Sequence, residues 1–238
     1  SSQTACLAGT YNPNTGSTTS ADCVGADAGH YVDLLSGVGQ SSQTACLAGT
    51  YNPNTGSIEP SDCVVADAGH YVDQSGQSSQ TACLAGTYQA DTGQDDCDDA
   101  DAGHYVDLAL GVGQSSQTAC LAGTYNPNTG STASTDCIVA DTGHYVDHSG
   151  QSSQTACLAG TYNPGTGSTN SLDCLDADAG HYVDQSGQSS QTACLAGTYQ
   201  ADTGQDDCDD ADAGHYVDLA LGVGQSSQTA CLAGTYNP

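Results

Sequence analysis

Apolar residues occur along this chain in short runs, which glycine, serine and asparagine interrupt. The stretches Thr10-Tyr11 and His30-Tyr31-Val32 are rich in residues that favour β-strands, and Gly29 and turn sequences such as Asn-Pro-Asn-Thr-Gly bound them. No stretch carries a sustained helical apolar period. The pattern predicts strands of roughly two to four residues in small hairpins.

The sequence Ser-Ser-Gln-Thr-Ala-Cys-Leu-Ala-Gly-Thr-Tyr recurs seven times, with one interval of 40 and then five of 37 between successive starts. Such a period indicates a linear array of small units in place of one globule. Residues 189–238 are identical to residues 78–127, and recent duplication is the simplest cause. The repeats span 1–40, 41–77, 78–114, 115–151, 152–188 and 189–225, with a partial seventh at 226–238.

Each repeat is a doubled half-repeat. The first half runs from Cys6 through Tyr11 to Cys23, and the second runs from Cys23 through Tyr31 to Cys46. The offset from cysteine to the following tyrosine is 5 or 8, whereas that from tyrosine to the next cysteine is 9, 12 or 15. Length variation is therefore expected in exposed turns. Tyrosine is the large aromatic residue of each half-repeat, and we expect its ring to pack over a disulfide or against the next half-repeat.

Composition places this pattern in an unusual class of protein. The chain has 13 cysteines and 28 acidic residues but no lysine, arginine, phenylalanine, tryptophan or methionine. So few large apolar residues cannot offset the entropy of ordering the chain, at about 1–2 kcal/mol per residue, so disulfides must supply the difference. We therefore expect an extracellular, disulfide-stabilised chain.

The net charge of −28 excludes several functions. Nucleic acids and anionic lipid surfaces should repel the chain, and phosphate-handling enzymes would lack their usual cations. The longest apolar runs, such as Leu108 to Val112, are far short of the ~20 residues that cross a bilayer. We expect no nucleic-acid partner and no membrane span, in what looks like a segment of a longer protein.

The motif Cys-x-x-Gly-Thr-Tyr followed by a second cysteine resembles ephrin-receptor-like repeats and the first module of TNF-receptor cysteine-rich domains. Those families usually add closely paired cysteines, whereas here each half-repeat has one cysteine, at spacings of 14 to 23. The composition also resembles giant surface repeat proteins of marine microbes. The resemblance implies an all-β fold of small disulfide-rich hairpins with little regular secondary structure, stacked into an elongated, solenoid-like rod or filament.

Two nearest-neighbour disulfide patterns are possible, and they differ in phase. Loop-closure entropy gives about 3 kcal/mol per bridge in either pattern, so it does not choose between them. One phase joins Cys23 to Cys46 and continues to Cys231, leaving Cys6. The resembled module implies the other phase, which pairs Cys6–Cys23, Cys46–Cys63, Cys83–Cys97, Cys120–Cys137, Cys157–Cys174 and Cys194–Cys208 and leaves Cys231.

Two clusters of aspartate are candidate Ca²⁺ sites, because each places five carboxylates in seven residues and hard oxygen ligands suit this ion. The spacing falls short of an EF-hand loop, and a solvated, mutually repelling surface is the alternative. The residues are Asp95, Asp96, Asp98, Asp99 and Asp101, and Asp206, Asp207, Asp209, Asp210 and Asp212.

One histidine recurs in each repeat, as in Gly29-His30-Tyr31, and only His144 and His148 form a local pair. We expect hydrogen-bonded structural histidines and no catalytic site, because a small hairpin offers no pocket that excludes water. Serine and threonine gather at 17–20 and 131–135, where O-linked glycan is plausible.

These features predict a non-enzymatic structural protein, a fibre, stalk or filament on or outside a microbial cell. It would associate head to tail or continue as one long chain, because repeats contact only their neighbours. An adhesin or receptor-like ectodomain that binds carbohydrate or protein is the alternative function. Ca²⁺ and glycan are candidate additional partners, and no organic cofactor is expected.

Overall fold

A computed structural model describes residues 3–33, 35 and 37–235, without the side chains of residues 108 and 219. Two compact units divide the chain, and each is described by itself. Unit 1 comprises Ser1–Asp101, Tyr105–Thr118 and Thr129–Ala133, and unit 2 comprises Ala102–His104, Ala119–Asn128 and Ser134–Pro238.

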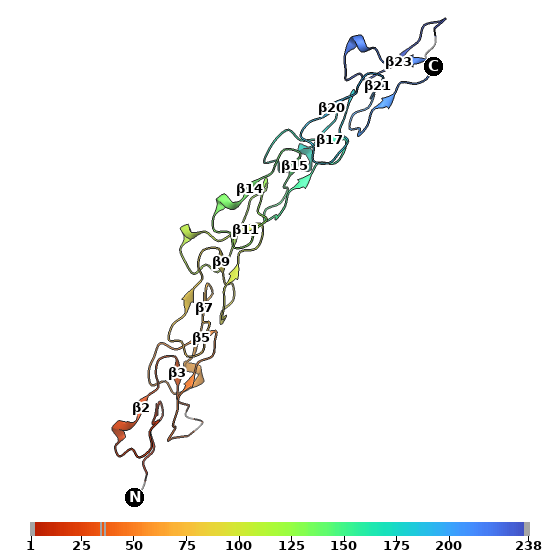
Figure 1. Ribbon diagram of the computed structural model, residues 1–238. Helices are drawn as coiled ribbons and strands as arrows, with labels where there is room; N and C mark the ends of the chain where they lie inside the picture. The colour runs from red at the N-terminus through yellow and green to blue at the C-terminus, as the bar shows by residue number, and fades with distance from the viewer. Residues whose placement is uncertain (1–2, 34, 36, 236–238) are drawn as a thin grey trace. The chain divides into compact units, whose positions relative to one another are not determined.

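Strands of two residues pair as antiparallel hairpins, and they form twelve two-stranded sheets within the described residues. Between residues 1 and 101 the hairpins follow one another in chain order (Figure 1). They are β1 (Thr10–Tyr11) with β2 (Val24–Gly25), β3 (His30–Tyr31) with β4 (Thr44–Ala45), β5 (Thr50–Tyr51) with β6 (Val64–Val65), β7 (His70–Tyr71) with β8 (Thr81–Ala82), and β9 (Thr87–Tyr88) with β10 (Asp98–Asp99).

The same hairpin recurs in the rest of the chain. The remaining sheets are β11 (His104–Tyr105) with β12 (Thr118–Ala119), β13 (Thr124–Tyr125) with β14 (Ile138–Val139), β15 (His144–Tyr145) with β16 (Thr155–Ala156), β17 (Thr161–Tyr162) with β18 (Leu175–Asp176), β19 (His181–Tyr182) with β20 (Thr192–Ala193), β21 (Thr198–Tyr199) with β22 (Asp209–Asp210), and β23 (His215–Tyr216) with β24 (Thr229–Ala230). The prediction of an all-β fold of small disulfide-rich hairpins is confirmed; its stacking into an elongated rod stays a prediction.

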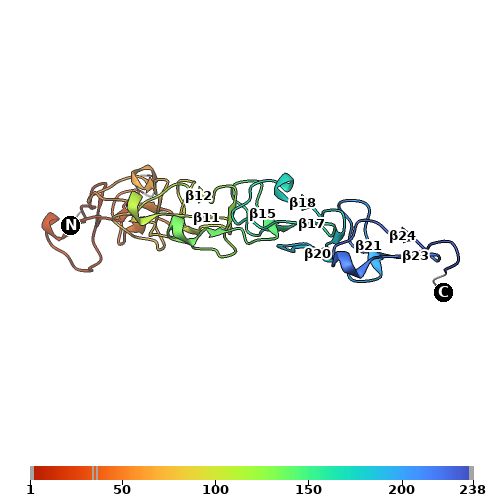
Figure 2. The same cartoon turned by 90° about the horizontal axis from the view of Figure 1, so that it is seen from above.

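Irregular loops make up most of the backbone, as both views show (Figures 1 and 2). Short 3₁₀ helices interrupt them at η1 (Ser20–Asp22), η3 (Pro60–Asp62), η4 (Leu108–Leu110), η5 (Ser134–Asp136), η6 (Ser171–Asp173) and η7 (Leu219–Leu221). The carboxylate of Asp62, the last residue of η3, caps the start of this helix. Its Oδ2 accepts hydrogen bonds from the main-chain N–H groups of Ile58 (2.8 Å) and Glu59 (3.1 Å). Asp22 and Asp173 cap η1 and η6 in the same way.

The core is narrow and is built from small side chains. Nearly every half-repeat buries the residue that opens the hairpin, as Cys46 and Ala66 do, and most also bury the residue that follows the tyrosine, as with Asn52 and Val72. The buried amide of Asn52 is satisfied, because Nδ2 donates to Oγ of Ser57 (2.8 Å) and to the carbonyl of His30 (3.2 Å). A polar residue can thus occupy a core position that valine fills in the alternate half-repeat.

Main-chain hydrogen bonds join each half-repeat to the next. Between β5–β6 and β7–β8 in unit 1, Gly49 N donates to Val72 O (2.8 Å), Asn52 N to Gln77 O (3.1 Å) and Gly76 N to Cys46 O (2.8 Å). The corresponding atoms between β17–β18 and β19–β20 in unit 2 make the same three bonds, at 2.8, 3.1 and 2.8 Å. These bonds involve backbone atoms only, so they persist although the side chains of the two kinds of half-repeat differ.

In most half-repeats the glycine before the Thr-Tyr or His-Tyr pair also contacts a half-repeat of its own kind. A Cβ atom on Gly49, which has φ of +80°, would lie 2.2 Å from the carbonyl oxygen of Gly93. This position therefore requires glycine for two reasons: the backbone is left-handed, and a neighbouring turn approaches closely.

We expect Gly49→Ala to destabilise unit 1 by about 1–3 kcal/mol more than Gly16→Ala. Gly16 has φ of +76°, but a Cβ added there would have no neighbouring atom within 4 Å. Both substitutions thus add backbone strain, and only Gly49→Ala adds a clash. Denaturant unfolding of the two variants measures the difference, and equal free energies of unfolding would contradict the assigned contact.

Candidate functional site

The disulfides close one hairpin in every repeat. Among the described residues six bridges occur, with Cα–Cα distances of 5.7 or 5.8 Å and sequence separations of 17 or 14. They follow the phase that the resembled module implies: Cys6–Cys23, Cys46–Cys63, Cys83–Cys97, Cys120–Cys137, Cys157–Cys174 and Cys194–Cys208, and Cys231 is a free thiol. We call the hairpin that contains such a disulfide the bridged half-repeat.

The other half-repeat carries a pair of hydrogen bonds close to the position at which the bridged one has its disulfide. The main-chain N–H of Asp27 donates to Oε1 of Gln43 (2.7 Å), and Nε2 of Gln43 donates to Oδ2 of Asp27 (2.7 Å). We call this arrangement the Asp–Gln clasp and the hairpin that contains it the clasped half-repeat. It recurs as Asp67–Gln80, Asp101–Gln117, Asp141–Gln154, Asp178–Gln191 and Asp212–Gln228.

Sequence reasoning missed the clasp although its signal was present. The glutamine belongs to the Ser-Ser-Gln-Thr-Ala-Cys sequence that defines the repeat, and the aspartate precedes each Gly-His-Tyr by two residues. Of these aspartates, only Asp101 and Asp212 belong to the clusters for which the sequence offers Ca²⁺ sites or a solvated surface. The partner of each one lies 13 or 16 residues away, across a turn of variable length.

The structure disperses the first aspartate cluster. Asp98 and Asp99 form β10, in which consecutive side chains point to opposite faces. Asp101 is engaged in a clasp, and Oδ1 of Asp96 accepts the main-chain N–H of Cys97 (2.8 Å). Asp209, Asp210, Asp212 and Asp207 take the equivalent places in unit 2. In the part of the chain that the structure describes, no group of three or more His, Cys, Asp or Glu residues could hold a metal ion.

The first aspartate cluster alters the hydroxyl of the tyrosine opposite it. Tyr88 of β9 lies opposite Asp98 in the hairpin. Partial burial, then the negative charges of Asp101 and Asp98, raise the pKa of the Tyr88 hydroxyl. A tyrosine hydroxyl is neutral at physiological pH even at its ordinary pKa, and this upward shift makes its ionisation harder still.

The recurring histidines have structural contacts. Nδ1 of His30 lies 3.3 Å from the carbonyl oxygen of Ala28, and the ring faces Gly76 of the next repeat, where a Cβ would lie 3.2 Å from Cε1. His70, His104, His144 and His181 face the turn glycines Gly113, Gly150, Gly187 and Gly224 in the same way. Each ring thus fills the space beside a glycine turn of the following clasped half-repeat.

His148 makes an exposed hydrogen-bond contact of its own. Its Nδ1 lies 2.8 Å from Oδ1 of Asp147, and the hydrogen bond from His148 lowers the pKa of the Asp147 carboxyl. The structure gives His144 a separate partner, the carbonyl oxygen of Thr142 at 3.1 Å. The two histidines that are close in sequence therefore act independently.

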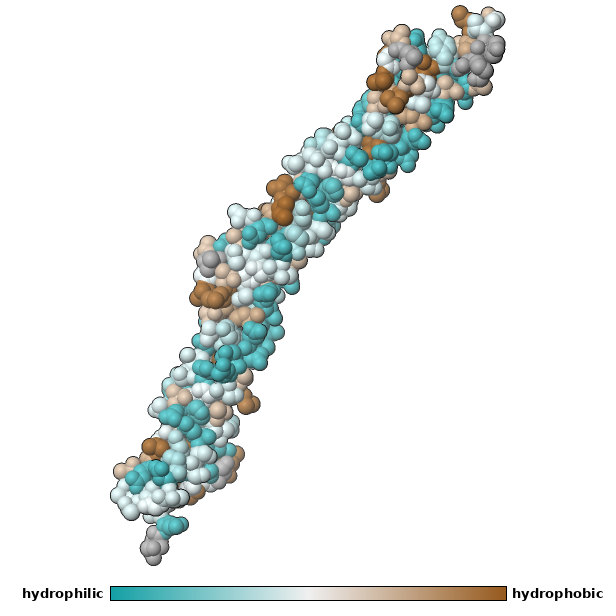
Figure 3. All heavy atoms as spheres, in the orientation of Figure 1, coloured by the Kyte–Doolittle hydropathy of each residue, from teal (hydrophilic) through white to brown (hydrophobic). Residues whose placement is uncertain are grey.

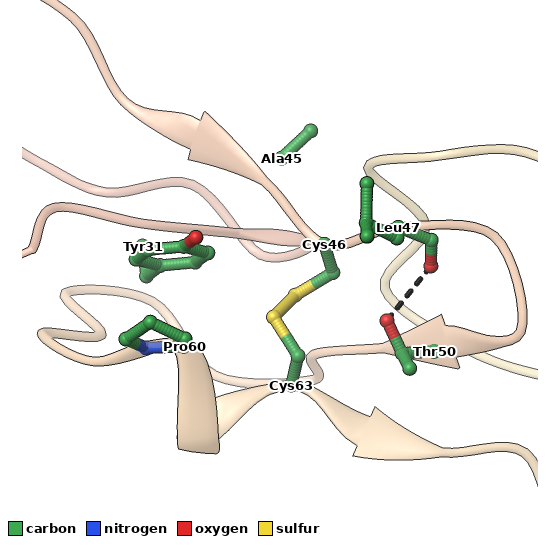
Figure 4. A pocket seen from close by; sticks show the side chains of 7 residues that line it. All are labelled: Tyr31, Ala45, Cys46, Leu47, Thr50, Pro60 and Cys63. Carbon is green, nitrogen blue, oxygen red and sulfur yellow. Dashed lines mark hydrogen bonds between the residues drawn. A yellow bond between two sulfur atoms is a disulfide. The ribbon is translucent and has the colours of Figure 1, made fainter. Parts of the chain in front are cut away.

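A shallow hollow lies where β3–β4 meets β5–β6 in unit 1 (Figure 4). It encloses about 190 Å³ and is lined by Tyr31, Ala45, Cys46, Leu47, Thr50, Pro60 and Cys63. The Tyr31 ring lies beside Pro60, with the disulfide next to them, and the Thr50 hydroxyl donates to the Leu47 carbonyl (2.7 Å). The hollow is smaller than the roughly 300–1,000 Å³ typical of small-molecule sites, and its lining carries no carboxylate, imidazole or amine.

One leucine of each bridged half-repeat projects into solvent. Leu47 is 73% exposed and Leu121 is 74% exposed, and apolar residues form separate spots on the visible surface (Figure 3). The clasped half-repeats carry aspartate at the same position. Of the segments considered for glycan, residues 17–20 are exposed throughout, whereas Ser131 is buried.

No family model matches the chain, and no match to a curated protein was found. Within the described residues no helix has the length and apolar character needed to cross a membrane.

The Asp–Gln clasp predicts that substitutions of two glutamines in one half-repeat differ in their effect on the stability of the chain. We expect Gln80→Ala to destabilise the chain by about 1 kcal/mol, because it removes both hydrogen bonds of a solvent-accessible clasp. Gln74→Ala is the matched control, because Gln74 lies exposed in the loop between β7 and β8. Denaturant midpoints that fall equally in both variants would show that the clasp contributes nothing.

Proposed function

We propose that the protein is a structural extracellular repeat protein that forms a fibre, stalk or filament on or outside a microbial cell. The observation that supports this most is the set of three main-chain hydrogen bonds between successive half-repeats. Such bonds let an array grow by adding identical neighbours, and they require no particular side chain at the junction. The proposed role is therefore one of length and spacing, without enzymatic activity.

Disulfide chemistry supports an extracellular location. Six bridges need an oxidising environment to form and persist, and small cores with many disulfides are typical of secreted domains. The likeness of the bridged half-repeat to ephrin-receptor-like and TNF-receptor modules points the same way. The uniformly negative surface keeps neighbouring chains apart, so partners would join head to tail or through one continuous chain.

An adhesin or receptor-like ectodomain is the second candidate function. The exposed leucine of each bridged half-repeat and the hollow beside Tyr31 favour it, because they offer apolar contact points in an otherwise polar surface. Protein or carbohydrate would be the ligand. Glycan on the exposed residues 17–20 is compatible with either function.

Electron microscopy of chains with three and six repeats tests the proposed function. We expect thin rods whose length doubles with the number of repeats, because each half-repeat bonds to the next in sequence. The rods should withstand heating and should collapse when a reductant is added, since the bridges compensate for a small core. A length that does not grow with repeat number would overturn the structural role, whereas a compact ligand-bound form would favour the adhesin.

Calcium binding is a separate prediction for the aspartate-rich hairpins. If Asp98, Asp99 and their neighbours acquire Ca²⁺ by a local rearrangement, calorimetry should detect saturable binding with Kd of about 10⁻⁴–10⁻³ M. Asp98→Asn with Asp99→Asn should abolish one site, and Asp73→Asn, an exposed aspartate of another hairpin, should leave it intact. Titration without saturation would leave these carboxylates as solvated surface.

A further inference from the structure

Hairpins closed by a disulfide and hairpins closed by an Asp–Gln clasp alternate along the chain, and the two kinds differ in the tension that they can withstand. We infer that the protein is a limited-extension chain, in which tension opens the clasped half-repeats while the disulfides keep the bridged loops closed. The inference goes beyond the proposed function, because it applies equally to a fibre, a stalk or an adhesin that presents a ligand-binding domain.

The clasp and the disulfide share one position and differ by one residue at the other. Cys46 precedes the first strand residue Thr50 by four positions, and Cys63 precedes Val65, the partner of Thr50, by two. In the next half-repeat Ala66 and Gln80 stand at the same offsets from His70 and its partner Ala82. The clasp joins Gln80 to Asp67, the residue after Ala66. The two hairpins are therefore closed at nearly the same place, covalently in one and by hydrogen bonds in the other.

Loop lengths agree as well. Ala66 and Gln80 are 14 residues apart, which is the separation of the Cys83–Cys97 bridge, and Ala26 and Gln43 are 17 apart, which is that of Cys6–Cys23. A disulfide would thus fit the clasped half-repeat as it fits the bridged one. Its absence there leaves one hairpin of each repeat able to open.

Tension follows the shortest covalent path between the ends of a chain. Within a bridged half-repeat that path crosses the S–S bond, so the loop between the two cysteines is bypassed. Within a clasped half-repeat the covalent path runs through both strands and the turn between them, because the clasp spans that turn with hydrogen bonds alone. Hydrogen bonds hold that segment, and the clasp atoms are open to water, which competes for them.

The sequence sets the amount of chain that can extend. The offset between successive disulfides is 20 or 23, as from Cys63 to Cys83 and from Cys23 to Cys46. At about 3.3–3.6 Å for each residue this gives roughly 70–80 Å per repeat. The bridged loops, of 17 or 14 residues, hold back roughly 50–60 Å more that only reduction releases.

Single-molecule stretching of the oxidised chain between two marker domains tests the inference. We expect full extension of the oxidised chain to correspond to the segments between successive disulfides alone, and to rise to the length of the whole repeats after reduction. A tether that ruptures before any repeat of the oxidised chain opens would overturn the inference. Equal extension before and after reduction would overturn it also.

Two variants of the β7–β8 hairpin identify which half-repeat opens. In Ala66→Cys with Gln80→Cys, an added disulfide should shorten the fully extended chain by roughly 50 Å, and reductant should restore the length. Each single cysteine variant controls for the substitution itself, and a thiol assay reports whether the bridge has formed. With the bridge formed, an unchanged extended length would show that this hairpin does not open.

The clasp itself is tested by opening force. Gln80→Ala should lower the opening force of one repeat, because it removes the clasp and leaves the main-chain bonds of β7–β8 in place. Gln74→Ala should leave all opening forces unchanged. Identical force distributions for the two variants would show that the clasp does not hold the hairpin closed.

Discussion

Covalent closure of alternate hairpins is the constraint on which this structure depends. The buried apolar residues are cysteine, alanine and valine, so each half-repeat removes little apolar surface from water. A loop of about 15 residues closed by a disulfide contributes about 3 kcal/mol by restricting the unfolded chain. Because this contribution is local, each repeat carries its own stabilisation and does not rely on a core shared with distant repeats.

Hydrogen bonding then extends that local order to neighbouring half-repeats. The carbonyl of buried Cys46 accepts a hydrogen bond from the N–H of Gly76. The main-chain carbonyl of Asn52 bonds to the hairpin before it, and its N–H bonds to the hairpin after it. A bridged half-repeat thus orders the clasped half-repeats on both sides. The alternation explains how a chain with so few large apolar residues adopts a defined fold with only one disulfide per repeat.

The sequence predicted the parts of this fold that depend on local signals. Glycine and asparagine turns bound the strands at Thr10 and His30 as expected, and the fixed distance from Cys6 to Tyr11 places both in one hairpin. The phase of the bridges came from a likeness to known modules, since loop entropy could not distinguish Cys23–Cys46 from Cys6–Cys23. Local signals were sufficient because each hairpin is closed within a short stretch of chain.

Contacts across turns and between half-repeats escaped prediction for the same reason. The partner of Asp67 is Gln80, and nothing in the residue types alone relates an aspartate to a glutamine 13 positions later. Density along the sequence likewise does not show where the side chains of the aspartate-rich segment lie, and Ca²⁺ binding there stays a prediction. In β10 the pleat directs Asp98 and Asp99 to opposite faces, and Asp101 is already bonded to Gln117.

The contact between each histidine and a glycine turn has a consequence for how such genes can change. His30 packs beside Gly76, which lies two half-repeats further along, so the contact joins one clasped half-repeat to the next. Recombination between copies that removes an even number of half-repeats keeps every histidine opposite its glycine. Removal of a single half-repeat would place a histidine opposite a bridged hairpin. Duplication or loss of whole repeats therefore preserves the packing, and the identical segments 78–127 and 189–238 are copies of this kind.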